Sequence, residues 1–244
     1  GACHGVAIHA KLYPIIYTLS FLTNFVQKPP LSTSNNKFGV RILLVWIRRL
    51  LSPAPLLFGV TTVVVFGSLT YLAYTIYGPV ALHEGLLYHF SRVDHRHNYS
   101  MHWYWIYLCR ANGISMTLVG RLLLLPQIVL LFYTSLGVAP HNLCLAIFAQ
   151  TFLFVAHNKV ITAQYFTWYL CLLPLASDSL RMTRRVVRAL IFLVVSILFW
   201  LGSAYCLEMQ GWSVHRIVWF ASVVFFWANV NLLGALLESS SSAL

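Results

Sequence analysis

The chain has 244 residues, of which 59% are hydrophobic and only 9% are charged. A soluble domain carries roughly 25% charged residues, so this composition excludes an ordinary water-soluble protein and indicates a chain whose main solvent is lipid. The net charge of +11 does not indicate nucleic-acid binding, because the basic residues lie in short links between apolar runs rather than on one basic face. The five cysteines include no C-x-x-C pair, so the sequence contains no metal or redox motif of that type.

Apolar segments predict about seven membrane-spanning helices and therefore an all-α, multi-pass transmembrane helix bundle. In chain order they lie at 6–26, 56–77, 114–136, 143–156, 166–176, 187–207 and 217–237. The segments 143–156 and 166–176 are shorter than the ~20 residues that cross a bilayer. We expect these two to be tilted, to continue into the link between them, or to form a re-entrant pair. One transmembrane domain is assigned to residues 1–244.

The distribution of Lys and Arg predicts the orientation of these spans. The links 27–55 and 179–188 are basic and are predicted to be cytosolic. The segments 78–113, 157–165 and 208–216 then lie together on the opposite, lumenal side. The segment 78–113 is also basic, against the simple rule, and such an exception marks it as the first place to look for function.

The segment 81–107 has three parts with different patterns. Leu82, Leu86, Phe90 and Val93 recur at helical spacing, which predicts an amphipathic helix at the membrane surface. A dense polar patch follows at 92–98. An aromatic set comes next and is expected to anchor the chain at the level of the lipid headgroups: Trp103, Tyr104, Trp105 and Tyr107.

The polar patch at 92–98 allows three interpretations. It could be a solvated interfacial face with snorkelling arginines. It could be a metal site built on Asp94, His95 and His97, although such closely spaced residues converge poorly on one ion and Arg92 and Arg96 would repel it. It could bind a phosphate-bearing lipid, because arginine forks and histidine donors suit phosphate oxygens.

The patch runs into a glycosylation sequon, Asn98-Tyr99-Ser100. The sequon lies inside the polar patch and close to the membrane. We therefore predict that Asn98 carries no glycan.

Three blocks of this sequence resemble one known enzyme family. The stretch HEGLLYHFSRVDHRHNYS at 83–100 resembles the signature of glycosylphosphatidylinositol (GPI) mannosyltransferase I. The stretch NKVITAQYFTWYLCLLP at 158–174 resembles a second block, and HAKLYPIIY at 9–17 resembles a third, in the same order and spacing. The resemblance implies a fold of the GT-C glycosyltransferase type in the membrane of the endoplasmic reticulum, with the active site in lumenal loops.

The resemblance also implies an activity and a partner. The reaction is an inverting transfer of the first α-1,4-linked mannose from dolichyl-phosphate-mannose to glucosaminyl-phosphatidylinositol, without a metal or other cofactor. The implied partner is a small single-span stabilising subunit.

One departure from the family pattern concerns the catalytic carboxylates. The family carries a D-x-D type motif in a lumenal loop near its N-terminus, and this sequence contains no D-x-D. We expect the chain to be the C-terminal portion of the enzyme, with the catalytic base in the missing loop, or a product that is inactive alone.

Inverting transfer needs a carboxylate to take the acceptor proton and cations to stabilise the phosphate leaving group. Glu84 is the alternative base within this chain, although it can equally pair with a nearby histidine. Lys11 could instead be a snorkelling residue at the end of a span, and Gln164 could serve an inter-helix hydrogen bond. The candidate substrate-binding residues are Lys11, His83, Arg92, Asp94, Arg96, His97, Lys159 and Gln164.

Two other classes of function remain as alternatives. A transporter would carry charges deep inside its spans, and the predicted spans are almost free of ionisable residues. An inactive remnant or scaffold stays open, because the sequence has no D-x-D motif.

Overall fold

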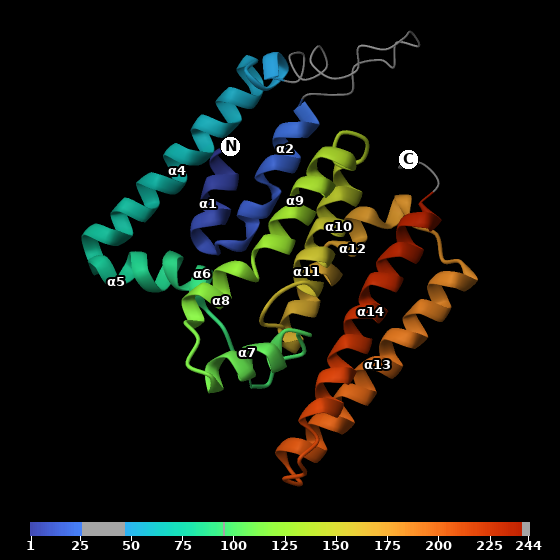
Figure 1. Ribbon diagram of the computed structural model, residues 1–244. Coiled ribbons are helices and arrows are strands. Elements are labelled where there is room, and N and C mark those ends of the chain that lie inside the picture. The colour runs from blue at the N-terminus through green and yellow to red at the C-terminus, as the bar shows by residue number, and fades with distance from the viewer. Residues whose placement is uncertain (26–46, 95, 241–244) are drawn as a thin grey trace, which may run out of the picture. The chain divides into compact units, whose positions relative to one another are not determined.

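The computed structural model describes residues 1–25, 47–94 and 96–240 (Figure 1). Within these ranges the regular elements are helices and there is no strand, which confirms the all-α prediction. Four of the described helical segments are long and apolar enough to cross a membrane. Most of the predicted cytosolic link 27–55, and His95 of the metal-site interpretation, lie outside the described residues.

The chain divides into two compact units, each described by itself. The first unit contains Gly1–His89 and Leu131–Ile147, and the second contains Phe90–Leu130 and Phe148–Leu244. The assignment of one transmembrane domain to the whole chain stays a prediction.

The first unit begins with two short helices in place of the single helix predicted at 6–26, and that prediction is wrong. Helix α1 (Ala2–Ala10) ends at Lys11, whose backbone is extended, and the turn η1 (Tyr13–Tyr17) leads into α2 (Thr18–Phe25). Pro14 explains the break, because proline lacks an N–H and restricts the residue before it. The two helices run in opposite directions (Figure 1), and His4 contacts Thr18 at 2.9 Å. Lys11 therefore lies in the turn of a helical hairpin.

Helix α1 packs closely along α4 (Pro53–Tyr77). The hydroxyl of Thr62 donates to the carbonyl of Gly1 at 3.2 Å, and His9 contacts Thr70 at 3.4 Å. A Cβ atom on Gly5 would lie 2.7 Å from the carbonyl oxygen of Thr62. Glycine is thus required where the two backbones approach, as at many helix contacts in membranes.

Helix α4 confirms the span predicted at 56–77, and it ends at Gly78, which has the positive φ of 73° common at helix ends. The chain turns away from α4 there and continues as α5 (Pro79–Leu82), the π-helical η2 (His83–Leu87) and α6 (Tyr88–Ser91) (Figure 1). The predicted amphipathic segment is therefore helical. Its place at the membrane surface stays a prediction.

In the second unit α7 (Trp103–Ala111) precedes a span with a break. The segment predicted at 114–136 consists of α8 (Met116–Leu122) and α9 (Leu125–Gly137), and it is confirmed as one long apolar stretch. Pro126 follows the break. The Leu124 N–H bonds the Arg121 carbonyl at 3.1 Å, so it does not reach the Gly120 carbonyl that an unbroken helix would use.

Helix α10 (Leu143–Ala156) has the predicted bounds, but the continuous helix predicted at 166–176 is wrong. That region is a series of short pieces: η3 (Ala163–Tyr165), α11 (Phe166–Leu170), α12 (Leu173–Ala176) and η4 (Ser177–Ser179). Pro174 at the start of α12 accounts for one interruption. The total number of membrane crossings stays a prediction.

Two long helices complete the second unit and confirm the last two predicted helical segments. They are α13 (Arg184–Glu208) and α14 (His215–Ser239), which form an antiparallel hairpin (Figure 1). The Nε1 atoms of Trp103 and Trp200 both donate to the hydroxyl of Ser222, at 3.1 and 2.9 Å. Trp103 is 5% exposed, so its predicted role as a headgroup anchor is wrong, whereas Trp105 is 43% exposed.

Replacement of Gly5 by alanine is expected to destabilise the first unit. The added methyl group would press on the backbone of α4, and such overpacking costs about 1–3 kcal/mol. The measurement is thermal unfolding of the purified chain in detergent. The control is Gly67→Ala on α4, where a Cβ meets nothing within 4 Å; equal stability of the two variants would contradict the close contact between α1 and α4.

Candidate functional site

Three segments that were predicted to lie on one side of the membrane meet in the second unit. The Tyr99 N–H donates to the Ile161 carbonyl at 2.9 Å. The Tyr99 ring stacks on the Trp200 ring, with 3.9 Å between the ring centroids. His97 contacts Glu208 at 3.0 Å. The segments 90–102, 157–162 and 208–214, which we call the loop face, are thus brought together. Their exposure to the lumen stays a prediction.

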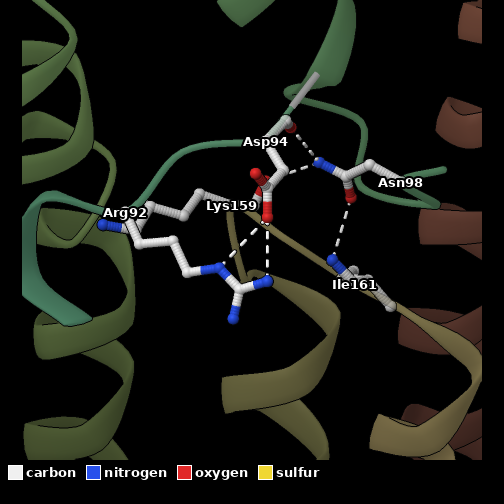
Figure 2. A network of polar contacts seen from close by, with 5 residues as sticks. All are labelled: Arg92, Asp94, Asn98, Lys159 and Ile161. Atoms are coloured by element: carbon white, nitrogen blue, oxygen red, sulfur yellow. Dashed lines mark hydrogen bonds and ion pairs between the residues drawn. The ribbon is translucent and has the colours of Figure 1, made fainter. Parts of the chain in front are cut away.

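Asn98 is the centre of this arrangement (Figure 2). Its Nδ2 donates to the carbonyls of Asp94 and Lys159, at 2.8 and 2.9 Å. Its Oδ1 accepts the N–H groups of Ile161 and Ser100, at 2.8 and 2.9 Å. The side chain uses both donors and both lone pairs, and Asn98 is 3% exposed.

Burial of Asn98 supports the prediction that it carries no glycan. A glycan on Nδ2 would replace one of the two N–H donors that bind the carbonyls of Asp94 and Lys159. The sequence pattern marked Asn98 only as part of a sequon, and its structural role was missed. Its place in a polar patch between two apolar runs gives no information on long-range partners.

Arg92 and Asp94 form an ion pair beside Asn98. The Nε and Nη2 atoms of Arg92 lie 3.0 and 2.9 Å from the same oxygen, Oδ2 of Asp94 (Figure 2). Both side chains are partly exposed, at 35% and 42%. Asp94 therefore orients the guanidinium group.

Lys159 is a buried cation held by backbone carbonyls. It is 3% exposed, and its Nζ donates to the carbonyls of Phe90 and Gly120, at 2.9 and 3.1 Å. These carbonyls belong to α6 and α8, close to the ends where the helix dipole favours positive charge. The Gly120 carbonyl can accept this bond because the break before α9 diverts its usual donor.

Burial, and then the nearby positive charge of Arg92, lowers the pKa of Lys159 to about 8. The group of Arg92, Asp94 and Lys159 has two basic side chains and one carboxylate. It therefore carries an excess of positive charge when Lys159 is protonated. A partly desolvated site of this kind favours an anion.

The other predicted site residues lie in different places. Arg96 and His97 are exposed and line a cavity next to Glu208, and Gln164 is exposed in η3. In the first unit Lys11 is exposed in the helical hairpin. His83 lies 2.7 Å from Glu84 with both side chains exposed, which matches the histidine pairing considered for Glu84.

Two histidines were missed by the sequence analysis. His102 and His157 are partly buried in the second unit, and within the described residues the buried Nε2 of His102 has no hydrogen-bond partner. Burial, and then the proximity of His157, lowers the pKa of His102 to about 4. His102 is thus neutral at physiological pH.

No cluster of three or more His, Cys, Asp or Glu side chains occurs in the part of the chain that the structure describes. The interpretation of 92–98 as a metal site includes His95, which lies outside that part. The described geometry favours direct contact between basic side chains and an anionic ligand.

Four long apolar helical segments indicate a membrane protein, and its loop face carries basic side chains. The family model for mannosyltransferase (PIG-M) matches residues 1–237, and the chain belongs to this family.

Relatives from distant organisms agree with this assignment. The chain is 38% identical over 237 residues to the GPI alpha-1,4-mannosyltransferase I catalytic subunit of Danio rerio, covering 96% of this chain and 57% of that protein. It is 34% identical over 249 residues to GPI mannosyltransferase 1 of Dictyostelium discoideum, covering 94% of this chain and 55% of that protein. It is 37% identical over 211 residues to GPI mannosyltransferase 1 of Schizosaccharomyces pombe, covering 86% of this chain and 54% of that protein. The chain spans a little over half the length of these relatives, and no solved structure matches it.

Replacement of Asn98 by alanine is expected to loosen the loop face. The change leaves the N–H groups of Ser100 and Ile161 without their acceptor, and each unsatisfied buried group costs about 1–3 kcal/mol. Thermal unfolding in detergent measures the loss. Asn112→Ala is the matched control, because the Asn112 side chain bonds the carbonyl of Leu108 in its own helix. The role given to Asn98 is wrong if both variants unfold at the same temperature.

The buried Lys159 is expected to make stability rise with pH. Its ordinary pKa of 10.5 falls to about 8 in the folded chain, so below pH 8 both states are protonated and the cost of burying the charge is fully present. Between these values the folded state releases its proton first, and stability increases by up to about 3 kcal/mol.

The measurement compares unfolding temperatures from pH 7.5 to pH 10 for the original chain and for Lys159→Met. The variant should lack this part of the increase. Lys11→Met, which removes an exposed lysine, should retain it. An identical pH profile for all three proteins would show that Lys159 is not a buried cation.

Proposed function

We propose that this chain contributes the lipid-phosphate-binding part of a GPI mannosyltransferase. The enzyme would transfer the first α-1,4-linked mannose from dolichyl-phosphate-mannose to glucosaminyl-phosphatidylinositol. The observation that carries the proposal is the family match over residues 1–237. The printed names of the relatives, GPI mannosyltransferase 1 and a catalytic subunit, support it.

The geometry of the second unit suits the phosphate leaving group of such a reaction. As the bond between mannose C1 and the phosphate oxygen breaks, negative charge develops on dolichyl phosphate. Arg92, oriented by Asp94, offers planar donors to phosphate oxygens. Lys159 adds a charge in a water-poor setting, where electrostatic stabilisation is stronger than in water. A bound phosphate would in turn favour the protonated form of Lys159.

The acceptor side of the reaction needs a base. The acceptor hydroxyl forms the new bond to C1 with inversion, and its proton passes to a carboxylate. We place that carboxylate in a segment outside this chain, with Glu84 as the alternative within it. Lys11, His83, Arg96 and Gln164 are further proposed substrate contacts, and His97 is proposed to act beside them through its contact with Glu208.

The setting of the reaction belongs to the same proposal. The protein would reside in the endoplasmic reticulum membrane with its active site facing the lumen, and the reaction would need no metal or other cofactor. A small single-span subunit would stabilise it. Only 6% of the most apolar 18-residue stretch of α4 is buried. This exposed apolar surface leaves room for lipid or for such a helix.

Rescue of deficient cells tests the proposed function. In a chimera, residues 1–237 of this chain replace the matching segment of the Danio rerio relative. Cells that lack the first GPI mannosyltransferase should regain GPI-anchored proteins at their surface when they express the chimera. Normal membrane expression without any rescue would instead support the inactive remnant or scaffold.

Arg92→Gln in the same chimera tests the phosphate site. We expect surface GPI-anchored proteins to fall at least about tenfold, because loss of one charge-stabilising donor at a reacting group commonly costs that much or more. Arg184→Gln is the matched control, since Arg184 is an exposed arginine in the first turn of α13. Equal rescue by both variants would remove Arg92 from the site.

A further inference from the structure

A second site lies beside the Asn98 network, at the connected ends of α13 and α14. It is a cavity of about 700 Å³ within the second unit. Pockets for small organic ligands measure about 300–1,000 Å³, so the space suits one or two sugar rings. The candidate phosphate site of Arg92, Asp94 and Lys159 does not contribute to its lining.

The walls of this cavity combine aromatic rings with charged groups. Trp103 and Trp200 are buried and fixed through Ser222, while Trp212 is 59% exposed at the rim. Flat, rigid rings of this kind pack well against the C–H faces of sugars, and indoles attract cations. The charged and titratable lining residues are Arg96, His97, Glu208 and His215.

Glu208 is the one carboxylate among the lining residues, and His97 covers it. The imidazole Nδ1 lies 3.0 Å from Oε2 of Glu208, yet the His97 side chain is 78% exposed. A ring this exposed can move aside at little cost in packing. The pair is therefore an exchangeable contact rather than a buried structural one.

The backbone at His97 is also unusual. Its φ of 49° is the only positive value at a non-glycine residue in the described part of the chain. Strained conformations of this kind cluster at ligand-binding sites, where the surrounding structure maintains them. Here the bonds of the neighbouring Asn98 hold the segment in place.

We propose that this cavity binds the headgroup of the acceptor lipid, an amino sugar linked to an inositol phosphate, and that Glu208 recognises the free amine. The proposal rests on the proposed function for the identity of the acceptor. The ammonium group replaces the imidazole of His97 as the partner of Glu208. The sugar rings pack on the exposed indole of Trp212, and Arg96 and His215 face the phosphate.

Charge separates this assignment from the donor lipid. Mannose on a phosphate has no cation to offer a carboxylate, and Glu208 would repel the phosphate itself. An amino sugar linked to an inositol phosphate presents both charges, on neighbouring rings, and the lining of the cavity also carries both signs. Acetylation of the amine would remove the positive charge and add bulk at Glu208.

Direct binding tests the proposal without any need for catalysis. The full 244-residue chain is placed in phosphatidylcholine nanodiscs, and Kd is measured for glucosaminyl-phosphatidylinositol and for its N-acetylated form. We expect the free amine to bind at least about tenfold more tightly, as for the loss of a charge-assisted contact. Glu208→Gln should weaken binding of the free amine by a similar factor and remove the discrimination.

Two further variants separate recognition from folding. Glu238→Gln is the matched control, because Glu238 pairs with Arg185 at the opposite end of the same hairpin, and its Kd values should match the original chain. His97→Asn removes the competing imidazole, and asparagine tolerates positive φ, so this variant should bind the free amine more tightly.

The outcomes distinguish the inference from the function on which it rests. Equal affinity for both lipids, unchanged binding in Glu208→Gln, no binding at all, or displacement by dolichyl-phosphate-mannose would each overturn the assignment of the cavity. Rescue by the chimera together with any of these results would leave the mannosyltransferase function intact. Amine-selective binding without rescue would support the cavity and count against the transfer activity.

Discussion

The arrangement of the loop face depends on the side-chain amide of Asn98. One carboxamide joins the polar patch to the link after α10 through bonds to Lys159 and Ile161. Its bond to the Asp94 carbonyl also shapes the patch itself. These segments are far apart in sequence and have no strand or disulfide between them in the described residues. The positions of Arg92, Asp94, Arg96 and His97 therefore follow from a buried hydrogen-bond network, in which a missing partner is costly.

Interrupted helices supply the polar groups that this site uses. Residues near Leu123 leave the α-helical pattern, and the Gly120 carbonyl then becomes available to Lys159. In a bilayer, irregular backbone is tolerated where protein groups satisfy it. The break and the buried lysine thus stabilise each other: the carbonyls replace water around the ammonium group, and the ammonium group satisfies carbonyls that lost their usual donors.

The sequence predicted the parts of the fold that depend on hydropathy along the chain. The helices α4, α13 and α14 lie within three residues of their predicted bounds, because an apolar run long enough to cross lipid has few other conformations. The shorter α10 has the predicted bounds as well. The breaks at Lys11, which precedes Pro14, and before Pro174 were missed. Both prolines lie in apolar runs, and hydropathy does not register the N–H group that a proline lacks.

The candidate site was predicted only where a local pattern carried it. Arg92 and Asp94, two residues apart, were predicted as residues of the substrate site, and their side chains form an ion pair. Glu208 and His97 lie on segments more than a hundred residues apart, and Trp103 is buried by contacts with α13 and α14. No local pattern encodes such partners, so the cavity and the role of Asn98 emerged only from the three-dimensional arrangement.

The length of α13 and α14 has a consequence for how a ligand would reach the cavity. Each helix has 25 residues, or roughly 37 Å, against a hydrocarbon layer of about 30 Å. The connected ends of this hairpin would then extend only a few ångströms beyond the acyl chains, among the lipid headgroups. A lipid ligand would arrive by lateral diffusion within the bilayer, and occupancy would depend on its mole fraction in the membrane rather than on a bulk concentration.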